Sequence, residues 1–214
     1  ERRQKEGLTN EEWRKVFNYA EKTGIPFTAS VFDINGVDFL KELGAPFIKL
    51  ASSDLSNKNL IQYIAKSNIP LIISSGMAAL KEVIKSVDAF CQFNSITNLT
   101  VLHCVSVYPC KLENTALEKL KLLQRELRCN IGFSDHTENS KAACVATSMG
   151  VYCIEKHFTI DKEMDGFDHK FASSPEEFET YVQDIRSVEK ALKNSTELAP
   201  GEDITKIRAR RGVY

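Results

Sequence analysis

Residues 131–159 contain two short apolar runs separated by a helix-forming segment of small residues. A strand, a helix and a strand within about 30 residues form a βαβ unit, whose two strands are parallel. The first run ends in Ser134-Asp135-His136, and the second ends in Glu155-Lys156-His157. Because parallel strands end at the same edge of a sheet, we expect His136 and His157 to lie together. In barrels built from repeated βα units, the active site lies at that edge.

Two imidazoles at one edge are suited to hold a divalent metal with positions left open for a substrate. The alternative is a pair of ordinary polar residues that close two strands. The spacing of His136 and His157 alone leaves both interpretations open.

The same alternation of strand and helix recurs along the chain after an opening helix that Thr9 or Asn10 caps. We predict six strands, at residues 25–30, 47–52, 70–76, 99–104, 131–136 and 151–157. Helices are predicted at residues 35–43, 57–67, 80–90, 117–127, 142–149 and 175–194. Short, continuously apolar strands are typical of parallel sheets covered on both faces. The pattern favours an α/β fold, a (β/α)8 TIM barrel present as about six βα units, with two units expected upstream.

Hydroxyl residues and one lysine lie at the ends of the predicted strands or just after them. They are Ser30, Lys49, Ser52, Ser74, Ser75, Ser106, Tyr108 and Ser134. Hydroxyls and backbone amides donate hydrogen bonds and a lysine adds charge, so this set is suited to bind a phosphate. Any one of these serines could equally be a turn or cap residue, but five similar strand ends make coincidence a weaker explanation.

Lys49 has three interpretations: a surface-reaching side chain, an anion clamp, or a Schiff-base nucleophile. His103 precedes Cys104 within a strand, so we predict that it packs in the core. A polar loop follows the last strand, and its Asp168 and His169 could reach over the barrel mouth.

The overall composition excludes several classes of protein. A net charge of −1 over 214 residues argues against a nucleic-acid or anionic-membrane surface. No apolar run is long enough to span a bilayer. Six scattered cysteines without a CxxC pair predict free, buried thiols in a reducing cytoplasm.

Seven motifs, in this order along the chain, resemble the sialic acid synthase (N-acetylneuraminate synthase) family. They are FTAS (27–30), PFIKLASSD (46–54), ISSGM (73–77), LHCVSVYP (102–109), IGFSDHT (131–137), IEKHFT (154–159) and GFDHK (166–170). The resemblance implies condensation of phosphoenolpyruvate with N-acetylmannosamine or its 6-phosphate, with release of phosphate.

The resemblance also implies residue roles. His136 and His157 would be ligands of a Mn²⁺ or Mg²⁺ ion. The phosphoenolpyruvate cradle would comprise Ser30, Lys49, Ser52, Ser74, Ser106 and Ser134. The catalytic polar groups around the sugar would be Asp54, Tyr108 and Asp168.

This sequence departs from the family pattern at three positions. Ser106 and Asp54 stand where many bacterial members have Asn and Glu, whereas Asp135 stands where animal members can have Gly. These mixed features leave the free sugar and its 6-phosphate both open as the substrate.

The resemblance implies further parts that this chain does not contain. These are a first strand with a Glu, a second strand ending in Lys, and a C-terminal antifreeze-protein-like domain whose Arg reaches the partner subunit. We therefore expect residues 1–195 to form a partial barrel, residues 196–214 to be a linker, and the full-length protein to be a homodimer. The alternatives are a Schiff-base aldolase that uses Lys49 and a non-catalytic fragment.

Overall fold

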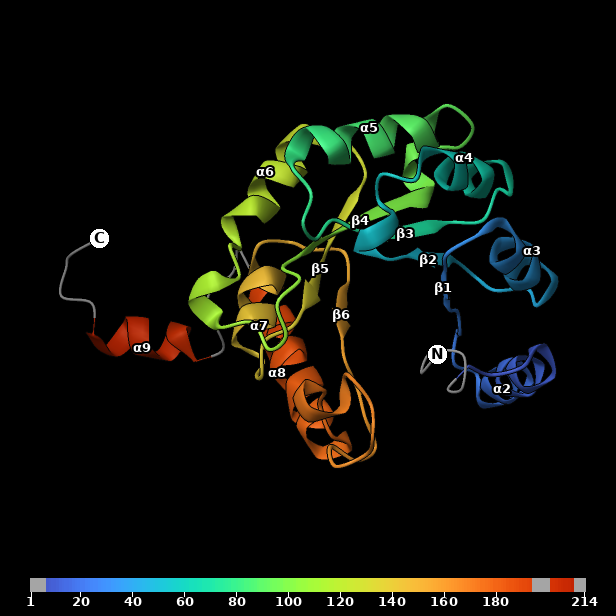
Figure 1. Cartoon of the computed structure of the whole chain (residues 1–214). Helices are drawn as coiled ribbons and strands as arrows, with labels where there is room; N and C mark the ends of the chain where they lie inside the picture. The colour runs from blue at the N-terminus through green and yellow to red at the C-terminus, as the bar shows by residue number, and fades with distance from the viewer. Residues whose placement is uncertain (1–6, 194–200, 210–214) are drawn as a thin grey trace.

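The computed structural model describes residues 7–193 and 201–209. Within these ranges six parallel strands form one sheet, and their order in the sheet follows the chain (Figure 1). The strands are β1 (Ser30–Val31), β2 (Ile48–Leu50), β3 (Leu71–Ser74), β4 (Leu99–Cys104), β5 (Asn130–Asp135) and β6 (Ile154–Lys156). The prediction of an α/β fold with six βα units is confirmed.

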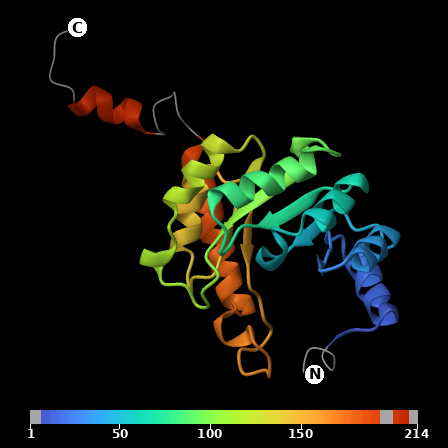
Figure 2. The same ribbon diagram turned by 45° about the horizontal axis from the view of Figure 1, so that its top comes forward.

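The connecting helices cover the outer face of the sheet, where α4, α5 and α6 lie in succession (Figures 1 and 2). The α-helices are α2 (Asn10–Thr23), α3 (Ile34–Glu42), α4 (Lys58–Lys66), α5 (Leu80–Cys91), α6 (Glu118–Glu126), α7 (Lys141–Ser148), α8 (Pro175–Leu192) and α9 (Glu202–Ala209). Short 3-10 turns are η1 (Ser52–Asp54), η2 (Ile96–Asn98), η3 (Leu112–Asn114) and η4 (His169–Phe171). A helix follows each strand, and such a helix is the usual crossover connection between parallel strands.

The core lies between the sheet and these helices. All six residues of β4 are buried, which is the pattern of a strand covered on both faces. His103 is buried within β4, and its Nε2 lies 2.7 Å from the backbone oxygen of Thr115. Its ring stacks on Phe133. The prediction that His103 packs in the core is confirmed.

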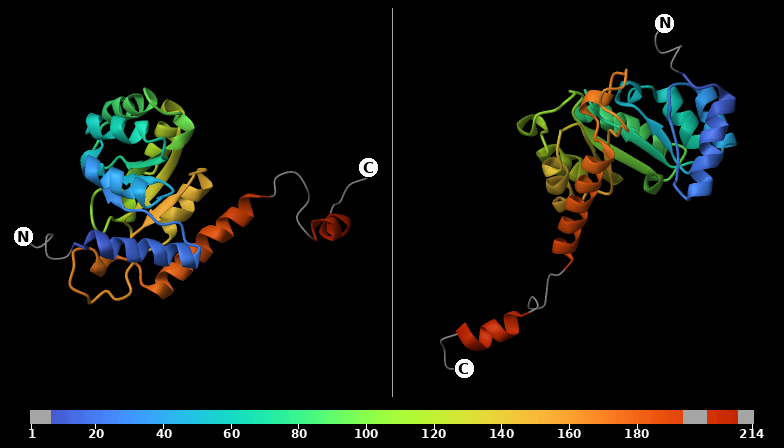
Figure 3. Two further views of the ribbon diagram at one scale, coloured as in Figure 1. Left: turned by 90° about the vertical axis from the view of Figure 1, so that its right-hand side faces the viewer. Right: turned by 90° about the horizontal axis from the view of Figure 1, so that it is seen from below.

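The sheet curls but remains open, so β1 and β6 each pair with only one strand in the described part of the chain. In the right-hand view of Figure 3, α2 (blue) lies at one side of the molecule and α8 (orange) extends downward from its middle. Apolar side chains near both edges are exposed, among them Ile25 and Phe32 at one edge and Tyr152 and Ile160 at the other. Within the described residues the sheet therefore has two open edges, at β1 and at β6.

The first strand is shorter than predicted. Residues 25–29 are outside β1, which pairs only at Ser30 and Val31. Pro26 lacks an N–H group, and an edge strand has a neighbour on one side only. Phe27 and Ala29 still pack against the core, so the apolar pattern correctly indicated burial but not strand pairing.

Capping residues close both ends of α2 and the start of α8, and Thr9 is one of the two caps predicted for α2. Thr9 and Glu12 form a capping box at the start of α2, and Gly24 adopts a left-handed conformation at its end. Ser174 caps α8, with Pro175 at its first position.

All six cysteines lie in the described part of the chain and are free thiols. Cys104 and Cys110 are buried, but Cys91 is exposed at the end of α5, so the prediction of burial is wrong for Cys91.

Among the described residues, no helix is both long and apolar enough to cross a bilayer. Of the predicted linker, residues 196–200 and 210–214 lie outside the described residues, and α9 occupies the stretch between them.

Candidate active site

A cavity of about 410 Å³ opens where β2 to β6 end. Its lining residues are Lys49, Ala51, Ser52, Ser53, Ser74, Met77, Cys104, Ser106, Tyr108, Ser134, His136, Glu155 and His157. Eight of the predicted site residues are in this set: Lys49, Ser52, Ser74, Ser106, Tyr108, Ser134, His136 and His157. Side chains from five strand ends are thus brought together, as the parallel topology predicts.

Strand alternation determines which side chains enter the cavity. Ser134 pairs with Glu155 in the β5–β6 register, and both line the cavity together with the histidines two residues further on. Asp135, between Ser134 and His136, contacts the Tyr181 hydroxyl of α8 on the opposite face. Successive side chains of a strand point to opposite faces. The pairing of β5 with β6 therefore places Ser134 and His136 on the cavity face together with Glu155 and His157.

Lys49 is held by three groups. Its Nζ donates to Ser74 Oγ at 2.7 Å and to the backbone oxygen of Leu50 at 3.2 Å, and it lies 3.5 Å from Glu155 Oε2. The Lys49 side chain is only 13% exposed. A lysine fixed in this way presents positive charge at a defined place, which suits a clamp for an anion.

Glu155 was not among the predicted site residues. Its Oε1 accepts a hydrogen bond of 2.7 Å from Ser134 Oγ, so one carboxylate orients both Ser134 and Lys49. The signal was present in the sequence, because Glu155 precedes His157 by two residues and must share its face of the strand.

The hydrogen bond of His136 determines its tautomer. Nδ1 lies 2.7 Å from the backbone oxygen of Val105, which only accepts, so Nδ1 carries the proton. Nε2 therefore keeps its lone pair and is available as a ligand. Burial lowers the pKa of His136 below its ordinary value, which further favours the neutral imidazole.

The two imidazoles lie close enough to share an ion. Their ring centres are 5.3 Å apart. An ion bonded to an imidazole nitrogen at about 2.1 Å lies about 3 Å from the ring centre, so two rings on one ion lie at most about 6 Å apart. His136 and His157 fit this test.

No cluster of three or more His, Cys, Asp or Glu suited to a metal occurs within residues 7–193 and 201–209. An ion held by these two histidines would take its other ligands from water or substrate, as Mg²⁺ and Mn²⁺ commonly do.

Tyr108 forms an aromatic wall beside both histidines. Its ring centre lies 4.1 Å from that of His136 and 5.7 Å from that of His157. Phe171 packs against Tyr108 from the loop that follows β6. Burial raises the pKa of the Tyr108 hydroxyl, so it remains a neutral hydrogen-bond donor near neutral pH.

Gly76 packs against two serines that line the cavity, Ser52 and Ser106. Its N–H donates to Ser52 Oγ at 3.0 Å. A Cβ at this position would overlap Ser106 Oγ and lie 2.8 Å from Ser52 Oγ. The two serines can approach this backbone only because residue 76 has no side chain.

Four predicted site residues do not line the cavity. Ser75 is buried, and its hydroxyl donates to the backbone oxygen of Leu102 at 2.8 Å. Ser30 is exposed on β1, next to Lys49 in the strand register. Asp54 lies at the end of η1, where Ser53 donates to it at 2.8 Å. Asp168 is mostly exposed, but its Oδ2 lies 3.6 Å from His157 Nδ1 and so reaches the edge of the site.

Comparison with known proteins places this chain in a family. Residues 1–197 match the NeuB family. The chain belongs to the NeuB family. It is 37% identical to the N,N'-diacetyllegionaminic acid synthase of Legionella pneumophila over 94% of its own length and 57% of that protein. It is 34% identical to the human N-acetylneuraminate-9-phosphate synthase over 91% of its length and 54% of that protein.

The fold of this NeuB-family chain also matches a solved relative. The crystal structure of N-acetylneuraminic acid synthetase from Leptospira borgpetersenii in complex with citrate superposes with a TM-score of 0.85 at 28% identity. The match covers 94% of this chain and 70% of that one. The NeuB-family chain thus spans somewhat more than half of the length of the two curated relatives described above.

Proposed function

We propose that the protein is a nonulosonic acid synthase that condenses phosphoenolpyruvate with N-acetylmannosamine or its 6-phosphate and releases phosphate. The observation that carries this proposal is the cavity in which Lys49 and four strand-end serines lie beside His136 and His157. The synthase relatives support the same reaction class.

The anion-binding part of the cavity suits phosphoenolpyruvate. Lys49 supplies a positive charge whose position is fixed by Ser74 and Glu155. Ser52 and Ser106 flank Gly76, and together they offer hydroxyl groups to phosphate oxygens. Ser30 remains a proposed member of this cradle on the basis of the family resemblance.

The histidine side of the cavity suits the sugar aldehyde. His136 and His157 would hold Mn²⁺ or Mg²⁺, which would supply Lewis-acid polarisation of the aldehyde. Tyr108 stacks beside both rings and closes this side of the cavity. We place Asp54 and Asp168 with Tyr108 as the polar groups around the sugar.

The proposed reaction forms one carbon–carbon bond and breaks one carbon–oxygen bond. The methylene carbon of phosphoenolpyruvate attacks the aldehyde carbon, and the aldehyde oxygen takes up a proton. Water adds to the resulting oxocarbenium carbon and loses a proton. Phosphate then leaves with the bridging oxygen and takes up the proton that the added hydroxyl loses, which gives the 2-keto acid.

An isotope experiment tests this route. Phosphoenolpyruvate labelled with ¹⁸O at the bridging oxygen should release labelled phosphate, in a reaction that depends on N-acetylmannosamine or its 6-phosphate. Unlabelled phosphate would indicate cleavage at phosphorus and contradict the proposal. A covalent pyruvate adduct on Lys49, trapped by borohydride, would instead support a Schiff-base aldolase. A protein without either reaction would be a non-catalytic fragment.

The proposal extends to the organisation of the protein. Residues 1–195 would form the barrel part, and residues 196–214 would lead toward a C-terminal domain. The full-length protein would be a homodimer, and its free thiols would be suited to the cytoplasm.

A further inference from the structure

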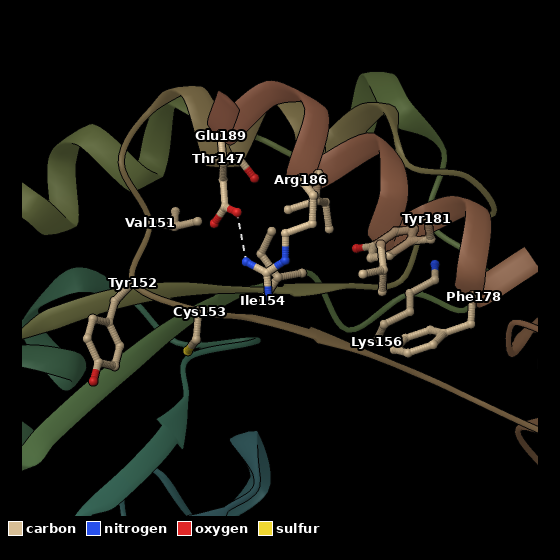
Figure 4. A pocket seen from close by; sticks show the side chains of 12 residues that line it. Thr147, Val151, Tyr152, Cys153, Ile154, Lys156, Phe178, Tyr181, Arg186 and Glu189 are labelled. Atoms are coloured by element: carbon tan, nitrogen blue, oxygen red, sulfur yellow. Dashed lines mark hydrogen bonds and ion pairs between the residues drawn. The ribbon is translucent and has the colours of Figure 1, made fainter. Parts of the chain in front are cut away.

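A second polar cluster lies on the other face of β5 and β6, away from the cavity. It consists of Asp135, Lys156 and Tyr181, and we call it the strand clamp. Figure 4 shows Lys156 and Tyr181 side by side in the layer between β6 and α8. A pocket of about 340 Å³ in this layer is otherwise lined mainly by apolar side chains, so charged groups here need a specific reason.

Asp135 is completely buried, and both of its carboxylate oxygens are engaged. Oδ1 accepts the backbone N–H of Thr137 at 2.8 Å. Oδ2 accepts the hydroxyl of Tyr181 at 2.8 Å and lies 4.0 Å from Lys156 Nζ. The carboxylate thus connects the end of β5 to α8.

Lys156 is equally enclosed, with a side chain that is 3% exposed. Its Nζ donates to the backbone oxygen of Thr137 and lies 5.2 Å from the centre of the Tyr181 ring. Asp135 and Lys156 are direct partners in the register of β5 and β6.

These contacts converge on the residue that follows His136. Thr137 has its N–H held by Asp135 and its carbonyl held by Lys156. Asp135 immediately precedes His136, and Lys156 immediately precedes His157. The backbone around one histidine is therefore tied to the strand that carries the other.

A buried ion pair is a weak source of stability, because well-packed apolar residues often serve as well. What it adds here is a fixed geometry between two strand ends. We propose that Asp135, Lys156 and Tyr181 are positioning residues that hold the ends of β5 and β6 so that His136 and His157 converge on one ion. This inference rests on the proposed metal role of the two histidines.

Manganese binding tests the clamp without any need for turnover. Free Mn²⁺ is followed by electron paramagnetic resonance during titration of the protein. Groups that orient metal-ligating histidines commonly affect affinity by about 10- to 100-fold. We expect Lys156→Met to weaken Mn²⁺ binding within this range, and Tyr181→Phe to weaken it less. Lys156→Arg should restore much of the binding, since Arg also donates to the Thr137 carbonyl.

A double variant separates positioning from stability. Asp135→Asn with Lys156→Met removes both buried charges together, so its melting temperature should recover relative to either single variant, whereas Mn²⁺ binding should stay weak. Arg186→Met is the matched control, since Arg186 lines the same pocket but pairs with Glu189 on its own helix. It should bind Mn²⁺ like the unaltered protein.

Two results would overturn the inference. If the clamp variants melt earlier but bind Mn²⁺ normally, while His136→Ala abolishes binding, the clamp is only structural. If His136→Ala and His157→Ala bind Mn²⁺ as tightly as the unaltered protein, the metal role in the proposed function fails, and the clamp proposal fails with it. Tyr181→Phe, which removes one hydroxyl, keeps the test available should the charge variants not fold.

Discussion

The amine of Lys49 lies 3.5 Å from the carboxylate of Glu155, although three strands separate β2 from β6 in the sheet. In a flat sheet, four strand spacings of about 4.8 Å would place these backbones about 19 Å apart, too far for the two side chains to meet. The ion pair therefore depends on the curl of the sheet, and both of its residues line the cavity.

Replacement of Lys49 tests its role as an anion clamp. Lys49→Ala should raise the phosphoenolpyruvate concentration needed for half-maximal rate by roughly 10- to 150-fold, which corresponds to a charge-assisted contact of about 1.5–3 kcal/mol. Steady-state phosphate release measures this. Lys121→Ala, an exposed lysine paired with Glu118 on α6, serves as the control and should behave like the unaltered protein. An unchanged requirement for phosphoenolpyruvate in Lys49→Ala would exclude the clamp.

The histidine pair predicts metal dependence. The variant with both His136→Ala and His157→Ala should lose activity supported by Mn²⁺ or Mg²⁺ but keep its circular dichroism spectrum. His169→Ala is a suitable comparison, because His169 contacts Thr159 and lies outside the cavity lining. Stoichiometric Mn²⁺ and full activity in the double variant would show that the ligands have been assigned wrongly.

Gly76 predicts a steric effect on the site. Gly76→Ala should displace Ser52 and Ser106, lower the free energy of unfolding by roughly 1–3 kcal/mol, and weaken phosphoenolpyruvate binding. Urea denaturation and ligand titration measure the two effects. Gly36→Ala is the control, because a Cβ there meets its neighbours at ordinary distances of 3.4 Å or more. If the two variants had the same free energy of unfolding and the same affinity for phosphoenolpyruvate, the surroundings of Gly76 would accommodate a methyl group at no cost.

His103 predicts a loss of stability in mild acid. Burial lowers its pKa below the ordinary value of 6.5, so below pH 6.5 the unfolded chain binds a proton that the folded chain does not. The free energy of unfolding should then fall as the pH drops from 6.5 toward the lowered folded pKa. His136 contributes in the same direction.

Urea denaturation at pH 8 and at pH 5.5 isolates the share of His103. His103→Gln should be destabilised at both values, because the contact with Thr115 changes, but it should lose less stability between them than the unaltered protein. The measurement at pH 8 serves as its own reference, since both proteins are neutral at this position there. If the unaltered protein and His103→Gln lost the same stability between pH 8 and pH 5.5, the pKa of His103 would not differ between the folded and the unfolded chain.

The open edges predict association when residues 1–214 are expressed alone. Unpaired strand edges with exposed apolar side chains can pair with the edges of other chains and so promote association. Tyr152→Lys, beside β6, should reduce light scattering, whereas Tyr19→Lys, equally exposed on α2, should not. A soluble monomer with cooperative melting would contradict this prediction.

Local patterns predicted most of the site but not its cross-strand contacts. His136 and His157 were placed correctly, because a βαβ unit brings two strand ends together. Glu155 was missed, since its importance comes from Lys49 on a distant strand, and only the curl of the sheet brings them together. Ser30 was predicted by analogy with the other strand ends, but β1 is an edge strand and Ser30 is exposed.

The alternation of side chains along β5 and β6 also favours one pairing register of the two strands. Ser134, His136, Glu155 and His157 occupy one face, and Asp135 and Lys156 occupy the other. If the register of either strand shifted by one residue, the side chains of that strand would exchange faces. The histidines would enter a layer built for a carboxylate, an ammonium and a phenol, and the clamp charges would lose their partners. The correct register is thus favoured by contacts on both faces. A chain with a shifted register would be less stable even without substrate.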